Sequence, residues 1–188
     1  MKTLAFLVLL LPALLEPRPA AAELASGTYR LVPQRAAAHI LVTSPIGRAR
    51  LELPFVEGDM VLDGDGRIIG GGAVLNAREM SANNVLVKKA LSGANGFHVD
   101  QHATVGFRVL GGEVRGDQIT IDGELTVKGV TLPVRFTGEL LRAEPQRMVA
   151  RLQTTIDRTG FGVTAGRPLY SREATVRLRL VGMKRRER

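Results

Sequence analysis

The sequence contains no cysteine, so neither a disulfide bond nor a catalytic thiol is available, and a lipid-modified N-terminal cysteine is excluded. Tryptophan is absent and aromatic residues make up only 4% of the chain, which argues against a nucleic-acid surface built on base stacking. The chain also lacks a Gly-x-Ser-x-Gly elbow and a glycine-rich phosphate loop leading into a helix. These absences favour a binding protein over an enzyme.

Long apolar runs are confined to the N-terminus. Met1-Lys2 is a short basic start, residues 4–15 are apolar and interrupted only by Pro12, and Ala20-Ala21-Ala22 offers small residues to a signal peptidase. We therefore expect residues 1–22 to be a cleaved signal peptide and the mature protein to be periplasmic. No later segment approaches the roughly 20 apolar residues of a spanning helix, so we expect at most a peripheral membrane contact.

The formal net charge is +8, and a basic tail at residues 183–188 contributes to it. Such a tail can contact anionic lipid or nucleic acid, but a solvated terminus is the simpler interpretation. We expect no nucleic-acid partner, and a homodimer remains an open alternative. The residues between signal peptide and tail, 23–182, suit one domain.

The clearest structural pattern is a hairpin around Lys128-Gly129. Apolar residues recur at every second position of 119–127 and again of 130–136, which places each set on one face of a strand. A two-residue connection with glycine at its second position fits a tight turn. The register then pairs Val127 with Val130 and Leu125 with Leu132.

The rest of the chain predicts about eight to ten strands at the spacing of an all-β barrel or sandwich. Pro54 predicts a bulge or an edge position, and Gly70-Gly71-Gly72 a weak point in a strand. Gly111-Gly112 predicts a turn between two strands. A short helix over residues 85–91 is expected between the strands, capped by Asn83 or Asn84 and stopped by Gly93.

Three stretches resemble the YceI-like family. Residues 123–134 match its block of glycine, Leu-Thr-hydrophobic, x-Gly-Val-Thr and x-Pro-Val, and residues 156–163 are similar to its late Arg and Phe-Gly block. Residues 51–63 resemble its early strand with phenylalanine and glycine. The resemblance implies an exported, antiparallel eight-stranded lipocalin-like barrel with one short helical insert. It also implies a bound polyisoprenoid lipid, such as an isoprenoid quinone, as the ligand and no separate cofactor.

The helical insert departs from the family pattern. Val87-Lys88 stand where the family has an Arg-Asp pair, and Gly96-Phe97 where it has paired phenylalanines. His98 replaces the following aspartate, and His102-Ala103 replace a Tyr-Pro pair. The helical insert, which we expect to act as a lid over residues 84–91, therefore differs in sequence from the family pattern.

The inward positions of the expected strands are aliphatic or phenylalanine, and they have two interpretations. The pattern alone favours a packed core, whereas the family resemblance favours a cavity for a lipid tail, whose burial contributes about 0.8 kcal/mol per methylene. Arg158 contacts either a lipid head group or backbone carbonyls and carboxylates at the rim. The residues expected to line the lumen are Phe55, Leu75, Leu91, Phe97, Val105, Phe107, Leu125, Leu132, Phe136 and Phe161.

Two further functions remain as alternatives. One is a non-catalytic scaffold or interaction protein with a filled barrel. The other, least favoured, is a metal-dependent hydrolase, because His98, Asp100 and His102 would share one face if they formed a strand. A solvated polar turn explains these three residues more simply, and we expect no metal.

Overall fold

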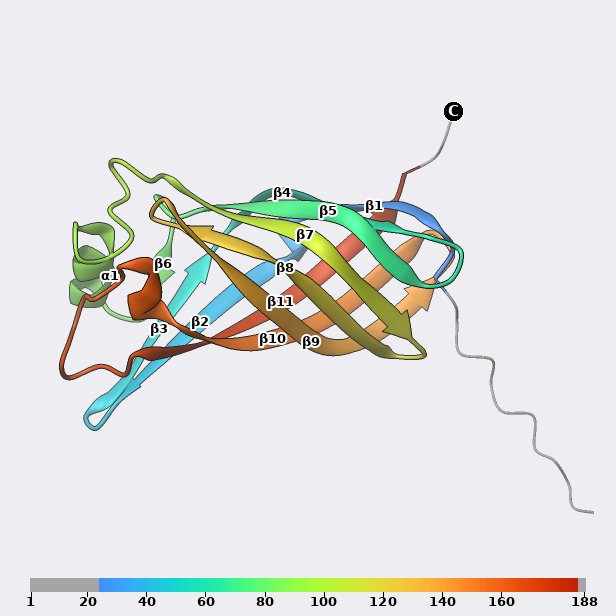
Figure 1. Cartoon of the computed structure of the whole chain (residues 1–188). Helices are drawn as coiled ribbons and strands as arrows, with labels where there is room; N and C mark the ends of the chain where they lie inside the picture. The colour runs from blue at the N-terminus through green and yellow to red at the C-terminus, as the bar shows by residue number, and fades with distance from the viewer. Residues whose placement is uncertain (1–23, 186–188) are drawn as a thin grey trace, which may run out of the picture.

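The computed structural model describes residues 24–185 and is dominated by long antiparallel strands, with a short helix at one end (Figure 1). The predicted signal peptide therefore lies outside the described residues. In chain order the elements are β1 Gly27–Leu31, η1 Pro33–Arg35, β2 Ala37–Ser44, β3 Gly47–Leu53, β4 Phe55–Leu62, β5 Arg67–Asn76, β6 Ser81–Ala82, α1 Val85–Ser92, β7 Thr104–Arg115, β8 Gln118–Val127, β9 Val130–Glu144, β10 Arg147–Asp157, η2 Arg158–Phe161 and β11 Glu173–Lys184.

The sheet closes on itself. Its strands follow the order β1-β4-β5-β7-β8-β9-β10-β11, and β1 pairs back with β11, where Tyr29 lies opposite Lys184. The ring therefore has eight strands, every neighbouring pair antiparallel. The predicted barrel is confirmed, and the alternative of two stacked open sheets is excluded.

Two of the ring positions are occupied by strands in two parts. Both β1 and β2 pair with β11, one after the other, and only η1 and its flanking residues separate them. In the same way β3 and β4 are separated by Pro54 alone, where proline removes the N–H that a continuous ladder needs. The short strand β6 then pairs with β3, Ala82 lying opposite Leu51. The barrel wall thus continues toward the helical end.

The hairpin of β8 and β9 has the predicted register. Val127 lies opposite Val130 and Leu125 opposite Leu132. The turn residues Lys128 and Gly129 both have positive φ, 53° and 77°, the geometry that lets a two-residue turn match the twist of its strands. This part of the fold is confirmed.

The helix α1 also forms as predicted. Asn84 is its N-cap and accepts a hydrogen bond from the Leu86 N–H at 2.7 Å, while the Gly93 N–H closes the last turn on the Lys89 carbonyl. Figure 1 places α1 across one end of the barrel. Among residues 24–185, no helix is long and apolar enough to cross a membrane.

One predicted break is wrong. β7 runs without interruption through Gly111-Gly112, where we expected a turn, because the two glycines accommodate a shift in register against β8 between Val109 and Gly111. The predicted weak point at residues 70–72 lies inside β5 and overlaps an interruption at residues 69–71 in its pairing with β7. β11 extends to Lys184, so the first residues of the predicted tail continue the strand.

The hydrophobic core lies inside the ring. Side chains such as Tyr29, Ile119 and Leu152 are almost completely buried there, as the alternation along each strand requires. The Phe107 ring crosses the inner face of β8 at Gly123, where an added Cβ would lie 2.4 Å from the ring. Gly123 therefore makes room for an aromatic side chain inside the barrel.

Replacing Gly123 with alanine is expected to destabilise the protein by about 2 kcal/mol, because the new methyl group overlaps the Phe107 ring and the Arg108 carbonyl. The matched control is Gly106→Ala on β7, where an added Cβ has no neighbour within 4 Å and the change should stay within about 0.5 kcal/mol. Urea unfolding of both variants measures the difference. Equal stabilities would contradict the packing of Phe107 against Gly123.

Candidate functional site

The barrel encloses two apolar cavities. The helix-side cavity, nearest α1, has a volume of about 100 Å³, and the far cavity, toward the other end, has about 70 Å³. Their walls are almost entirely aliphatic, methionine and phenylalanine side chains. The helix-side cavity is lined by Ala38, Ile40, Val42, Leu51, Leu53, Phe55, Leu75, Leu91, Phe97, Val105, Leu125, Val127, Phe136, Ile156, Arg158, Phe161, Val163, Ala174, Val176 and Leu178.

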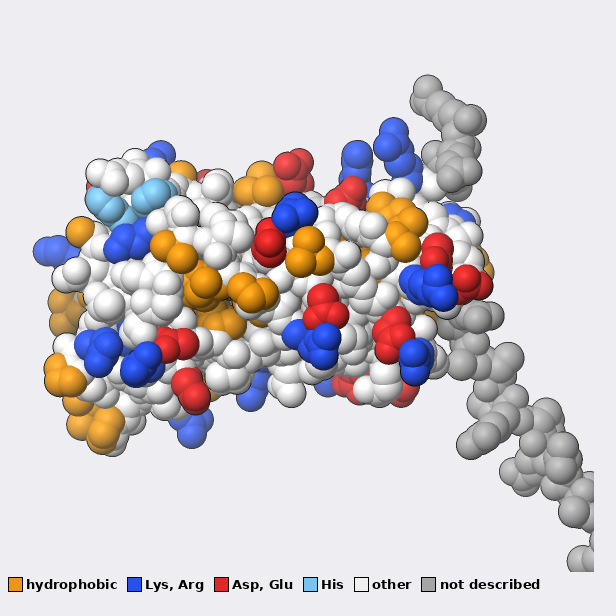
Figure 2. Space-filling model, in the orientation of Figure 1, with side chains coloured by type: hydrophobic (Ala, Val, Ile, Leu, Met, Phe, Trp, Pro, Cys, Tyr) orange, Lys and Arg blue, Asp and Glu red, His pale blue; other side chains and the backbone are white. Residues whose placement is uncertain are grey.

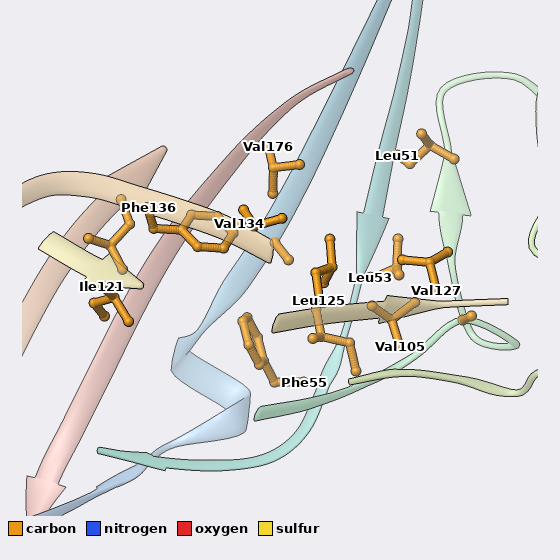
Figure 3. Packing of buried hydrophobic residues seen from close by; sticks show 14 of the residues in the cluster. Leu51, Leu53, Phe55, Val105, Ile121, Leu125, Val127, Val134, Phe136 and Val176 are labelled. Atoms are coloured by element: carbon orange, nitrogen blue, oxygen red, sulfur yellow. The ribbon is translucent and has the colours of Figure 1, made fainter. Parts of the chain in front are cut away.

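Three side chains separate the cavities. Phe55, Phe136 and Leu178 line both of them, so we call this set the partition. The Phe107 ring meets Phe136 edge to face, with ring centroids 5.4 Å apart and an interplanar angle of 88°. Figure 3 shows Phe55 and Phe136 within a cluster of side chains that come from several strands and point toward one another. The lumen is thus divided by side chains rather than by backbone.

The structure brings together nearly all the residues expected to line the lumen. Leu132 is the exception, since it is half-buried and lines neither cavity. Phe107 lies on the far cavity, and Phe55 and Phe136 lie on both. The residues on the helix-side cavity alone are Leu75, Leu91, Phe97, Val105, Leu125 and Phe161.

Several lining residues were missed by the sequence analysis. Ala38 on β2, Met148 on β10, and Val176 and Leu178 on β11 all face the cavities. A signal existed for β11, because alternate apolar positions such as Val176 and Leu178 share one face of a strand. The sequence does not reveal which of these inward side chains border a cavity, because that depends on how the barrel closes and how its side chains pack.

Arg158 is buried beside the helix-side cavity and is bound by backbone carbonyls. Its Nε donates to the Ser171 carbonyl at 2.8 Å, and its Nη1 donates to the carbonyls of Val163 at 2.8 Å and Ala165 at 2.9 Å. Its Nη2 donates to the Tyr170 carbonyl at 3.3 Å. The guanidinium therefore holds the loop between η2 and β11 in place.

Burial lowers the pKa of the Arg158 guanidinium from its usual value, and the positive charge of Arg167 lowers it further. The guanidinium nevertheless remains protonated, because an arginine side chain is not deprotonated in proteins. The carbonyl dipoles around the group therefore stabilise a buried cation. Arg158 therefore binds backbone carbonyls at the rim, which is one of its two predicted roles. Contact with a lipid head group, the other role, stays a prediction, and the side chain borders the cavity where a head group would lie.

Three segments cover the helix-side end of the barrel, and we call them the cover: residues 43–50, 83–96 and 159–171. The Lys128 ammonium group, at the tip of the β8–β9 hairpin, donates to the carbonyls of Ala94 and Gly162. The backbone N–H of Ser171 donates to the Thr43 carbonyl at 2.9 Å. These bonds tie the parts of the cover to one another and to the wall.

The proposed histidine cluster does not form a strand. Residues 97–103 make a turn in which the His102 N–H donates to the His98 carbonyl, and the two imidazole rings meet at a centroid distance of 6.1 Å. Within residues 24–185, no three histidine, aspartate or glutamate side chains are grouped to share a metal ion. The shared face on which the hydrolase alternative depended is therefore missing.

Comparison with known proteins identifies a related family. The model of the YceI-like domain matches residues 29–182, most of the chain. No curated protein sequence matches the chain.

Solved structures share the fold at low sequence identity. BcnA from Burkholderia cenocepacia superposes with a TM-score of 0.68 at 12% identity, over 80% of this chain and 98% of that one. A polyisoprenoid binding domain from Saccharophagus degradans, implicated in plant cell wall breakdown, gives 0.62 at 11% identity, over 86% and 100%. The YCEI protein of Campylobacter jejuni gives 0.60 at 13% identity, over 70% and 84%. At these identities the likeness concerns the fold.

Replacing Arg158 with methionine is expected to destabilise the protein by about 3 kcal/mol or more, because buried carbonyls lose their donors. Arg158→Lys should recover only part of this, since an ammonium group cannot span the same set of carbonyls. The matched control is Arg151→Met on β10, an exposed residue paired with Glu139, which should cost less than about 1 kcal/mol. Chemical denaturation of the three variants gives the comparison, and equal losses for Arg158→Met and Arg151→Met would contradict it.

Asp157 should show an unusually acidic carboxyl group. The Thr159 hydroxyl and the Arg172 guanidinium donate to it and lower its pKa from 3.8 to about 2. Because the folded-state pKa is depressed, the carboxylate stabilises the fold above the unfolded-state value of about 4, and this contribution is lost as pH falls toward 2. Thr159→Val should raise the pKa of the Asp157 carboxyl group, whereas Thr155→Val, on the same strand β10 as Asp157, should not.

NMR titration of the Asp157 carboxyl carbon measures this directly. A midpoint near the ordinary aspartate value in the unmodified protein would contradict the hydrogen bonds at the start of η2.

Proposed function

Since the chain belongs to the YceI-like family, we propose that it is a lipid-binding protein that holds a long-chain isoprenoid-type lipid, such as an isoprenoid quinone, in its barrel. YceI-like proteins are binding proteins rather than enzymes. The observation that carries the proposal is the pair of apolar cavities inside a closed barrel. The Saccharophagus degradans domain with the same fold is described as polyisoprenoid-binding, which supports the same ligand class here.

A long lipid must use both cavities. A cavity of about 150 Å³ in another protein admits a molecule as small as benzene, so volumes near 100 and 70 Å³ each hold only a short length of chain. The partition of Phe55, Phe136 and Leu178 must then rotate out of the way. The proposed binding step is therefore coupled to a rearrangement of side chains inside the barrel.

The energy of that rearrangement is small compared with the gain. Moving a side chain away from its preferred rotamer costs about 1 kcal/mol, so displacing the three residues of the partition costs about 3 kcal/mol. Each buried methylene contributes about 0.8 kcal/mol. About four methylenes offset the cost, and an isoprenoid chain supplies many more.

The polar end of the lipid would lie at the helix-side end. Arg158 borders the cavity there, and its Nη2 group donates to one carbonyl among the described residues, that of Tyr170. The second hydrogen of Nη2 would be donated to a head-group oxygen of the lipid. The proposed location of the protein is the periplasm, on the basis of the signal-peptide pattern at residues 1–22.

Purified protein should take up a fluorescent isoprenoid-lipid analogue, and Ala38→Phe should weaken this by about a hundredfold. Ala38 is 1% exposed and lines the helix-side cavity, so a benzyl ring there displaces several methylenes of the ligand. The matched control is Ile69→Phe, which adds bulk at an exposed position of β5 and should leave uptake unchanged. Circular dichroism checks that each variant folds.

An unmodified protein that folds but takes up no lipid would contradict the proposal. It would favour the alternative of an interaction protein with a filled barrel.

A further inference from the structure

A small pocket beneath the cover adjoins the helix-side cavity. This pocket, of about 50 Å³, lies where the three segments of the cover meet, with Ala49, Val87 and Tyr170 among its lining residues. Val42, Leu91 and Arg158 line both this pocket and the helix-side cavity. The entrance to the lumen at this end is therefore framed by α1, the β2–β3 hairpin and the loop before β11.

The outer surface of the cover carries exposed aliphatic side chains. Val85 is 81% exposed, Ile46 77% and Leu86 74%, the highest values among the large hydrophobic residues that the structure describes. Leu169 on the third segment adds a fourth exposed aliphatic side chain. Figure 2 shows hydrophobic side chains at this end of the molecule, at the left of the view. Exposed apolar side chains gathered at one place mark an interaction surface.

The charged side chains of the three cover segments are all basic. Residues 43–50, 83–96 and 159–171 contain five basic residues and no acidic one. The turns at the opposite end, within 63–67, 113–118 and 142–147, instead contain five acidic and four basic residues, and the basic residues Lys184 and Arg185 adjoin them. The cover therefore combines aliphatic tips with an unbalanced positive charge. Its basic residues are Arg48, Arg50, Lys88, Lys89 and Arg167.

We propose that the cover is a docking surface for a bilayer that contains anionic phospholipids. Aliphatic side chains at the tips of α1 and the β2–β3 hairpin would enter the boundary between head groups and acyl chains, and the surrounding cations would contact lipid phosphates. A bilayer matches both features at once, since it offers hydrocarbon beneath a layer of negative charge.

Docking in this orientation turns the entrance toward the membrane. The inward side of α1, with Val87 and Leu91, closes the entrance, while Val85 and Leu86 at its first turn face outward. A lipid could pass from the bilayer into the lumen without crossing water. This last step rests on the proposed function, whereas the docking itself does not.

Vesicle sedimentation tests the docking surface. We expect the full-length mature protein to bind vesicles of phosphatidylcholine and phosphatidylglycerol more tightly than vesicles of phosphatidylcholine alone, and to lose this preference at high salt. Lys88→Glu combined with Lys89→Glu should weaken binding by about tenfold or more. The matched control reverses two adjacent cations at the opposite end, Lys184→Glu with Arg185→Glu, and should change binding less than about twofold.

A second pair of variants tests the contribution of the exposed aliphatic side chains to vesicle binding. Val85→Ser combined with Leu86→Ser should weaken binding by about tenfold or more, because both side chains lose their burial among lipid chains. The control, Ile69→Ser with Leu110→Ser, removes two exposed aliphatic side chains from the barrel wall and should leave binding unchanged. Circular dichroism confirms the fold of each variant.

Two results would overturn the inference: no binding of the unmodified protein to either vesicle, or equal losses of binding for the cover variants and their controls. A separate measurement of lipid uptake from a detergent dispersion distinguishes failure of the docking surface from failure of the proposed function. If uptake persists without vesicle binding, only the docking surface is wrong. If vesicle binding persists without uptake, the docking surface stands and the lipid-carrying role is wrong.

Discussion

Closure of the sheet between β1 and β11 is the constraint on which the rest of the structure depends. With every position of the eight-stranded ring paired on both sides, alternate residues must point into a common interior, and the sequence places aliphatic and phenylalanine side chains at those positions. Pro54 and η1 each divide one of the wall positions into two strands, and the ring is nevertheless closed by the pairing of β1 with β11. An apolar lumen follows from this arrangement rather than from any single residue.

Local chemistry made part of the fold predictable. The Lys128-Gly129 turn, the alternation around it and the Asn84 cap are signals confined to a few neighbouring residues, and each led to the correct element. The turn predicted at Gly111-Gly112 was wrong because the same dipeptide suits a turn and a bulge. Only the pairing with the partner strand decides between them. A closed barrel could be predicted only from the family resemblance, because the pattern of strands alone also fits a sandwich.

The candidate site was predictable as a set of inward positions but not as a set of cavities. Leu132 and Leu125 lie opposite each other, yet only Leu125 borders empty space. The four carbonyls that hold Arg158 come from a loop without a repeating pattern, and Lys128 reaches across to two distant segments. Such contacts depend on tertiary packing, which strand periodicity does not encode.

The most direct test of a lipid-filled barrel is native mass spectrometry of the protein purified from cells that make isoprenoid lipids. We predict a mass that exceeds that of the chain by one lipid, and release of that lipid on extraction with organic solvent. A folded protein that shows only the mass of the chain, both as purified and after incubation with isoprenoid lipid, would contradict the account.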